Sequence, residues 1–172
     1  MDCRSDQYIL AIDPGNKQTA FCLLSPDLHP LKFAKQENEF AYCFMVEAVA
    51  QYGLIPDNMV VVIEWMQNYG RSVGQDVFRT IEWIGVLKER FGKAKYPVEE
   101  IIRAQEKMTI CHSMKADDAT IRQALIDRFA YGVPNYGKGS KKEPGWFYGF
   151  RADIWQAYAI GVTYHDLFLD RR

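Results

Sequence analysis

The sequence lacks several features that would each point to a particular class of protein. No apolar run approaches the roughly 20 residues needed to cross a bilayer, so we expect no membrane span. The first residues, MDCRSDQY, lack the apolar segment of a signal peptide, which favours an intracellular, cytoplasmic protein. The four cysteines are widely spaced without a Cys-x-x-Cys pair, which favours reduced thiols over a zinc site or a disulfide framework.

An excess of charge of one sign is also missing. There are 21 Lys and Arg residues against 22 Asp and Glu residues, a net charge of -1, so any nucleic-acid partner must meet a local basic patch. What is present is typical of a globular protein: 172 residues, of which 48% are hydrophobic and 25% charged. With no internal repeat or domain boundary, we expect a single domain over residues 1–172.

The first apolar runs predict an antiparallel start. Residues 8–12 and 19–24 have the composition of strands, and the PGNK segment at 14–17 supplies a turn between them. Residues 31–35 predict a third strand. A helix is expected over 39–52, where apolar residues recur at three- and four-residue spacing.

The rest of the chain predicts alternating strands and helices. The run NMVVVIEWM at 58–66 is β-branched and almost continuously apolar, as in a buried parallel strand. The other expected elements are helices over 77–91, 116–130 and 152–169 and a short strand over 96–102. This order predicts a mixed α/β sheet, antiparallel in its first three strands and then parallel, flanked by helices.

Three acidic residues lie where an ionised carboxylate is costly. Asp13 ends the first strand, Glu64 ends the apolar run of the fourth, and Asp153 opens the last helix. If the first and fourth strands are neighbours, Asp13 and Glu64 lie side by side, and the last helix can bring Asp153 to them. Clustered carboxylates repel one another and need cations, and an oxygen-only ligand set favours Mg²⁺ or Mn²⁺.

Each acid taken alone has a simpler structural explanation. Aspartate before Pro-Gly is a common turn residue, which would account for Asp13. Glu64 could meet solvent at a strand end, and Asp153 could be a helix N-cap. The metal interpretation therefore depends on the strand order that would bring the three together.

The ordered set of motifs resembles the RuvC-type Holliday junction resolvases of the ribonuclease H-like superfamily. The likeness comprises AIDPG on the first strand, VIE on the fourth and ADIWQAYAIGV at the last helix, and it extends over about residues 8–163. The aromatic PGWFYGF segment is similar to the phage-borne branch, so a phage or prophage origin is an expectation of the resemblance. The expected fold is therefore a ribonuclease H-like mixed sheet.

The resemblance also implies an activity. Such enzymes are homodimeric, metal-dependent endonucleases that cut opposed strands of a four-way DNA junction by phosphodiester hydrolysis. Asp13, Glu64 and Asp153 match the family's metal-binding and catalytic acids, with two Mg²⁺ or Mn²⁺ ions expected. Lys107 and Lys115 match two late catalytic lysines that face DNA.

One departure from the family pattern concerns a fourth metal ligand. The resolvases usually place Asp or His three positions before the last acid, and here that position is Phe150. The ligand could be absent, supplied from elsewhere or replaced by water. Asp117 and Asp118 are possible substitutes, although their place at the start of a predicted helix also suits acids for structural reasons.

Two segments are candidates for DNA contact. The loop GKGSKKEPGWFYGFR at 137–151 carries a local basic excess, which suits phosphate contacts. Its basic residues are Lys138, Lys141, Lys142 and Arg151. Trp146, Phe147 and Tyr148 could stack on unpaired bases or pack the loop onto the core. After Glu64, Tyr69 and Arg71 are candidates for contact at the junction, and residues 77–87 for a dimer interface.

Other functions remain open on sequence grounds. A related nuclease could act on flapped or branched DNA or on RNA–DNA hybrids with the same acids. A non-catalytic nucleic-acid-binding module could keep the fold, although clustered carboxylates beside phosphate argue against it. A phosphate-cradling turn of the sugar-kinase and actin type would require two such domains, for which 172 residues are too few.

Overall fold

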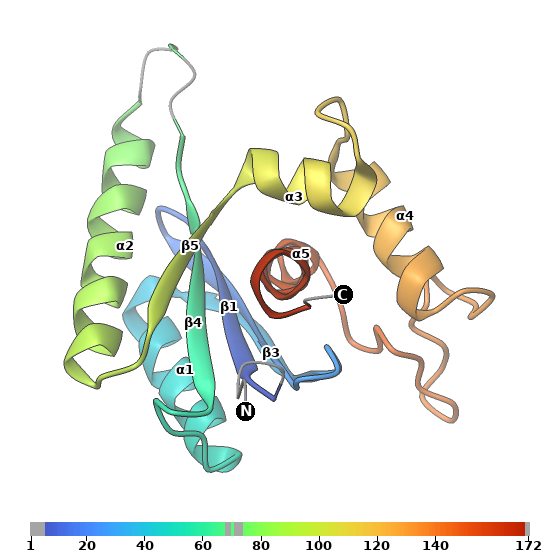
Figure 1. The fold of residues 1–172 in the computed structure, drawn as a ribbon, viewed down its shortest axis with the longest axis horizontal. Helices are drawn as coiled ribbons and strands as arrows, with labels where there is room; N and C mark the ends of the chain where they lie inside the picture. Colours follow the sequence, from blue (N-terminus) through green and yellow to red (C-terminus); the bar gives the residue numbers. More distant parts are fainter. Residues whose placement is uncertain (1–5, 68–69, 71–73, 171–172) are drawn as a thin grey trace.

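The computed structural model describes residues 6–67, 70 and 74–170, and a five-stranded sheet lies at its centre (Figure 1). The strands are β1 (Tyr8–Pro14), β2 (Gln18–Leu24), β3 (Pro30–Glu37), β4 (Met59–Trp65) and β5 (Val98–Ile102). Their order in the sheet is β3-β2-β1-β4-β5. The pairs β1–β2 and β2–β3 are antiparallel, whereas β1–β4 and β4–β5 are parallel, so the predicted mixed sheet is confirmed.

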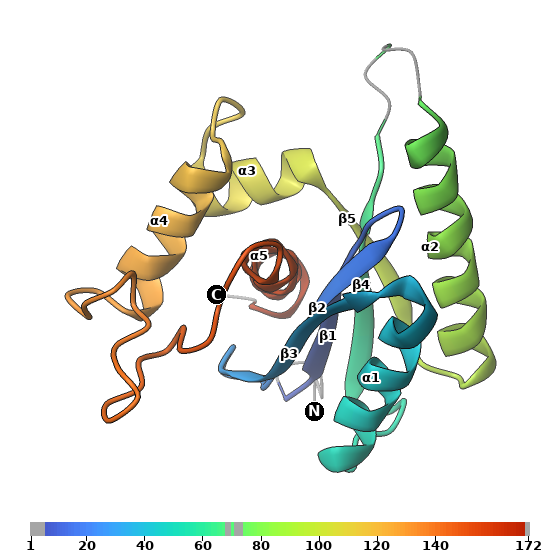
Figure 2. The same ribbon diagram turned by 180° about the vertical axis from the view of Figure 1, so that it is seen from behind.

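Helices cover both faces of this sheet (Figures 1 and 2). They are α1 (Asn38–Gln51), α2 (Gln75–Lys93), α3 (Arg103–Cys111), α4 (Asp118–Phe129) and α5 (Ile154–Tyr164), the last continuing into a π-helical turn, His165–Leu169. One face packs against α1 and α2, and the other against α5, with α3 and α4 beyond it. Alternate residues of β1 and β4 supply the two cores, because side chains on a strand alternate between its faces.

Helix α3 was not predicted from the sequence. Its segment, RAQEKMTIC, is mostly polar and has no clear apolar stripe, and the only fully buried side chain in it is that of Glu106. The helix begins directly after β5, where the Gln105 side chain accepts a hydrogen bond from the Ile102 backbone N–H at 2.9 Å. It contacts both α4 and α5, so tertiary packing rather than local pattern explains its formation.

Helix α5 lies unusually close to the sheet, and Gly161 makes this approach possible. A Cβ at that position would lie 2.7 Å from Leu24 Cδ1 and 3.2 Å from Ala11 Cβ, which are side chains of β2 and β1. Nearly all of the helix is buried, as expected for an element enclosed between the sheet and other helices. This close packing brings the start of α5 beside the end of β1.

An aromatic cluster fixes the loop before α5. Phe150 is 1% exposed, and its ring centroid lies 4.7 Å from that of Phe33 and 5.1 Å from those of Phe147 and Trp155. Phe147 is fully buried and packs edge-on against Tyr158 of α5. Phe150 is therefore a core residue, which explains physically why its position carries no ligand.

Among the described residues no helix has the length and hydrophobicity needed to cross a membrane. Cys22 is buried, Cys43 exposed and Cys111 partly buried, and all three are free thiols. Burial raises the pKa of Cys22 well above its ordinary value, so this thiol behaves as an apolar core group.

Candidate functional site

The ends of β1 and β4 bring Asp13 and Glu64 together. The parallel register pairs Ile12 with Ile63, so the two acids follow directly on neighbouring strands. Ile12 and Ile63 face α1 and α2, and alternation therefore directs Asp13 and Glu64 to the opposite face, which α5 covers. The adjacency that the sequence required for a metal site is present in the structure.

The two carboxyl groups are close enough to interact strongly. Burial raises the pKa of Asp13 well above its ordinary value, and the charge of Glu64 and a hydrogen bond between the two groups raise it further. Burial also raises the pKa of Glu64, although the hydrogen bond from Asp13 and the charge of Arg103 oppose this. Burial and mutual proximity therefore make it costly for both groups to be ionised without a cation.

Asp153 lies at the edge of this group. It occupies the N-cap position of α5 but makes no side-chain capping bond, and its carboxylate is 2.5 Å from Lys35 Nζ. Lys35 shares a row of the sheet with Asp13, because Ala20 pairs with both residues. Asp153 is half exposed, and its charge contributes to the raised pKa of Asp13.

A fourth acid, Glu106 of α3, was missed in the sequence. It is fully buried, the charge of Glu64 acts on it, and its own charge acts on Asp13. Burial, followed by the charge of Glu64, raises its pKa to about 8 despite the opposing effects of Arg103 and Gln156. Nothing in the polar RAQEKMTIC pattern marks Glu106 as buried, because its environment is created by elements distant in sequence.

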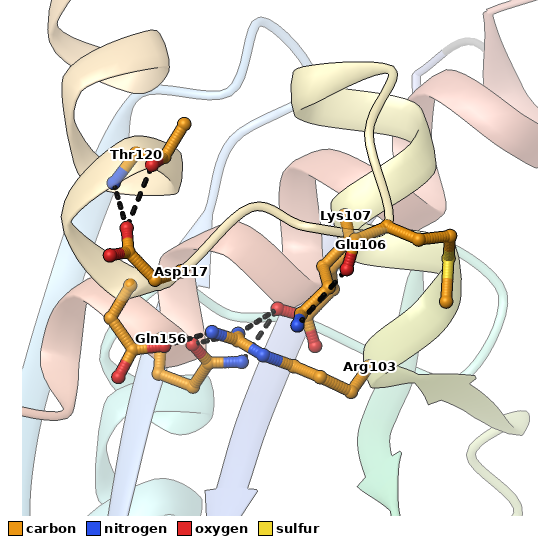
Figure 3. A network of polar contacts seen from close by, with 8 residues as sticks. Arg103, Glu106, Lys107, Asp117, Thr120 and Gln156 are labelled. Carbon is orange, nitrogen blue, oxygen red and sulfur yellow. Dashed lines mark hydrogen bonds and ion pairs between the residues drawn. The ribbon is translucent and has the colours of Figure 1, made fainter.

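Arg103 and Gln156 hold one oxygen of Glu106 (Figure 3). Glu106 Oε2 accepts hydrogen bonds from Arg103 Nη1 at 2.7 Å and from Gln156 Nε2 at 2.6 Å. Arg103 also contacts Asp118 and the side-chain oxygen of Gln156. Gln156 carried a signal in the sequence, since it is a polar residue in the apolar helix IWQAYAIGVTY, three positions after Asp153.

The predicted lysines lie near Arg103. Lys107, Lys115 and Arg103 line one open surface hollow together with the start of α4. Lys107 Nζ is 3.5 Å from the Met114 carbonyl oxygen, at the limit of a hydrogen bond, and Lys115 is exposed. The hollow thus combines three basic side chains with Asp117 and Asp118, and Arg103 connects it to Glu106.

Asp117 and Asp118 have structural partners. Asp117 caps α4 by accepting a hydrogen bond from the Thr120 backbone N–H at 2.8 Å, and the hydrogen bonds from Thr120 lower its pKa. Asp118 is largely exposed and is paired with Arg103. These contacts favour the helix-start interpretation for both residues.

The charge balance at the strand ends suits a hard cation. Asp13, Glu64 and Glu106 offer only oxygen atoms, and the guanidinium group of Arg103 acts on Glu64 and Glu106. Glu106 Oε1 has no hydrogen-bond partner among the described residues, although it is buried. These groups therefore fit a divalent ion such as Mg²⁺ or Mn²⁺.

The side chains at the strand ends are nevertheless more widely spaced than those of another group. Over the described part of the chain, the acidic or histidine ligand atoms that all lie within 4.8 Å of one another belong to His165, Asp166 and Asp170. This second cluster lies at the C-terminal end of α5, far along the helix from Asp153.

The predicted DNA-binding residues fall into two sets. Lys141 and Lys142 are exposed at the tip of a turn that is closed by a bridge between Gly139 and Pro144. Lys138 is partly buried beside this turn, and Arg151 is exposed just before α5. Tyr69 and Arg71 lie outside the described residues.

The aromatic residues of the same loop have different environments. Trp146 stacks on Phe129 with a centroid separation of 5.3 Å and donates a hydrogen bond to the Tyr158 hydroxyl at 3.0 Å. Phe147 is fully buried, whereas Tyr148 is 45% exposed. Packing therefore accounts for Trp146 and Phe147, and Tyr148 is the ring of the three that faces solvent.

Comparison with known proteins shows which fold this is. No protein-family model and no curated protein matches the sequence. Among solved structures, RuvC of Thermus thermophilus in complex with a Holliday junction substrate is similar, with a TM-score of 0.68 and 13% identity over 93% of each chain. A second Thermus thermophilus RuvC structure gives a TM-score of 0.56 and 14% identity over 92% of this chain and 93% of that one. The likeness confirms the expected RuvC-type, ribonuclease H-like fold.

Proposed function

We propose that this chain, built on the RuvC-type fold, is a metal-dependent endonuclease that resolves four-way DNA junctions by paired nicks. The observation that carries the proposal is the meeting of Asp13 and Glu64 at the ends of adjacent parallel strands, with too little positive charge to neutralise them. A module that only binds nucleic acid would gain nothing from such charges beside phosphate.

The acids would hold the divalent ions, with Asp13 between Glu64 on one side and Asp153 on the other. Bound there, such an ion would act as a Lewis acid on the scissile phosphate and lower the pKa of water. To hold such an ion, Asp13 and Glu64 would both have to be ionised, and Asp153 would have to exchange its contact with Lys35. Lys107 and Lys115 then neutralise phosphate charge from the adjoining hollow.

The basic turn at Lys141 and Lys142, with Lys138 and Arg151, would bind the phosphates of the junction arms. Tyr69 and Arg71, which follow Glu64 in the chain, are the proposed contacts at the junction centre. Phe78 and Ile81 of α2 expose apolar surface, 58% and 37% of each residue, which supports a homodimer formed through residues 77–87. A two-fold dimer would match the two-fold symmetry of paired nicks.

The test is cleavage of a synthetic four-way junction with mapped end-labelled strands. Paired, symmetric nicks in Mg²⁺ or Mn²⁺ and no cleavage in chelator are expected. Asp13→Asn should remove cleavage while retaining junction binding in a gel-shift assay. Full activity of Asp13→Asn in Mg²⁺ would overturn the assignment of the acids.

The same assay separates the neighbouring functions. A flapped duplex and an RNA–DNA hybrid serve as competing substrates at equal concentration. Preferential cutting of either one would replace junction resolution with a related nuclease activity. Binding to all three without cutting any, in either metal, would support a non-catalytic module.

A further inference from the structure

Glu106 is held by one oxygen and left free at the other. Its Oε2 accepts hydrogen bonds from Arg103 and Gln156, which come from α3 itself and from α5 (Figure 3). Two donors from separate elements fix the plane of a carboxylate far more tightly than one would. The orientation of the second oxygen is therefore determined by the fold rather than by solvent.

That second oxygen, Oε1, lacks a hydrogen-bond partner within the described part of the chain. The residue is 0% exposed, so bulk water does not reach the atom. A carboxylate oxygen buried in this way is costly, and native structures rarely retain one without a partner that lies outside the polypeptide.

The charged groups around Glu106 indicate the sign of the charge that a partner of Oε1 would carry. The charged groups that act on it are the carboxylate of Glu64 and the guanidinium of Arg103, and Glu106 acts in turn on Asp13. Arg103 is already engaged with Glu106, Gln156 and Asp118. The charged groups around Glu106 are therefore mostly acidic, and the arginine among them is already paired, which favours a cation as the partner of Oε1.

Asp153 does not lie next to Glu106 Oε1. Its carboxylate is bound to Lys35 at the outer edge of the group. The residue of α5 that reaches inward is Gln156, one helical turn later, and its amide nitrogen contacts Glu106. Helix α5 thus contributes a neutral hydrogen-bond donor where a carboxylate from α3 is already present.

We propose that Glu106 Oε1 is a ligand of the divalent cation that Asp13 and Glu64 bind, and that Gln156 and Arg103 are positioning residues that direct Oε1 toward it. The inference rests on the proposed function for the existence of that cation. It supplies from helix α3 the fourth acidic ligand that Phe150 cannot provide.

The test measures metal binding directly, without DNA. Mn²⁺ is titrated calorimetrically into the full chain and into Glu106→Gln, Glu106→Asp, Gln156→Met, Asp13→Asn and Asp166→Asn. Glu106→Gln should weaken Mn²⁺ binding by about a hundredfold, and Glu106→Asp, which keeps the charge but retracts the oxygen, by about tenfold or more. Gln156→Met should cost about tenfold. Asp166→Asn, which removes one charge from the distant cluster, should bind as the unmodified chain does.

Thermal unfolding in chelator separates ligation from a structural role. Glu106→Gln keeps the shape of the side chain and cannot ionise, so its Tm without metal should equal or exceed that of the unmodified chain. If Glu106 only anchors Arg103 and Gln156, the Tm of Glu106→Gln falls while its Mn²⁺ affinity is unchanged, and the inference is overturned.

Asp13→Asn keeps this result distinct from a failure of the proposed function. Loss of Mn²⁺ binding in Asp13→Asn together with normal binding in Glu106→Gln rejects only the role of Glu106. Normal binding in Asp13→Asn, or no binding in the unmodified chain, rejects the metal site itself and with it the role of Glu106.

Discussion

The protein has two clusters of acidic side chains, and they differ in how their charge is met. At the C-terminal end of α5, Asp166 accepts hydrogen bonds from Arg128 Nη1 at 2.5 Å and Nη2 at 2.9 Å, and His165 lies beside it. Burial alone would raise the pKa of Asp166, but the hydrogen bonds from His165 and Arg128 outweigh this and lower it to about 2. In the other cluster, the pKa values of Asp13 and Glu64 at the ends of β1 and β4 and of Glu106 in α3 are all raised.

The two clusters differ both in the spacing of their ligand atoms and in how far other side chains compensate their charge. The His165 cluster has the closer ligand atoms, but Arg128 is placed to satisfy its charge. Asp13, Glu64 and Glu106 are more widely spaced, yet Arg103 acts only on Glu64 and Glu106, and Glu106 Oε1 has no hydrogen-bond partner in the part of the chain that the structure describes. We therefore base the proposed cation site at the strand ends on uncompensated charge rather than on the distance between ligand atoms.

The largest expected difference between the clusters is in junction cleavage after one acid in each is neutralised. Asp13→Asn should lower the single-turnover rate in Mg²⁺ by about a thousandfold, because metal charge stabilisation is worth several kcal/mol. Asp166→Asn should leave the rate within about twofold, since its charge is met within the protein. Equal losses in both variants would contradict the distinction.

The pH dependence of stability should differ in sign between the clusters. Glu106 has a pKa of about 8 in the folded chain against an ordinary value of 4.5, so the folded state binds more protons between these values. With chelator present, stability should therefore fall as the pH rises through this window, by on the order of a few kcal/mol. Urea unfolding at several pH values should give a shallower slope for Glu106→Gln. An unchanged slope in that variant would mean that Glu106 ionises normally.

Asp166 should show the opposite trend. Because its pKa is lowered to about 2 from 3.8, its contribution is present above the ordinary value and is lost as the pH falls toward 2. Asp166→Asn should cost about 1 kcal/mol at neutral pH, a discounted value because Arg128 is partly exposed. The measurement is urea unfolding at pH 7 and below 4, where the variant and the unmodified chain should converge.

The smallest expected effect on stability and metal binding concerns Asp153 and its contact with Lys35. Lys35→Met removes the contact with Asp153, in which both side chains are partly exposed, so the free energy of unfolding should change by less than about 1 kcal/mol. Freeing the Asp153 carboxylate should tighten Mn²⁺ binding, by about fivefold at most. Weaker Mn²⁺ binding after the change would indicate that Lys35 positions Asp153 rather than competing for it.

The sheet and the pairing of its acids were predictable from the sequence. Short apolar runs separated by turn residues define the strands, and the β-branched run before Glu64 marks a central parallel strand. Once that strand lies beside β1, Asp13 and Glu64 must meet, because both follow the Ile12–Ile63 pair. The sheet was predicted correctly because the local apolar pattern of each strand and the order of the strands along the chain indicate the same arrangement.

The contributions of Glu106 and Gln156, and the contact of Asp153 with Lys35, were not predictable in this way. Glu106 lies in a polar segment that would suit a solvent-exposed turn, and its burial depends on packing of α3 against α4 and α5. The contact of Asp153 with Lys35 joins two elements far apart in the sequence. Gln156 alone could have been noticed, as a polar side chain on an otherwise apolar helix near Asp153.

The aromatic cluster before α5 surrounds Trp155, and this affects the intrinsic fluorescence of the protein. Trp155 packs against Phe147 with ring centroids 4.6 Å apart, and its indole also lines a small hollow with Asp153 and Gln156. Indole emission responds to the polarity and order of its immediate surroundings, so intrinsic fluorescence should report events at the start of α5 without any attached dye. The remaining tryptophans provide the background against which a Trp155→Phe variant would identify that signal.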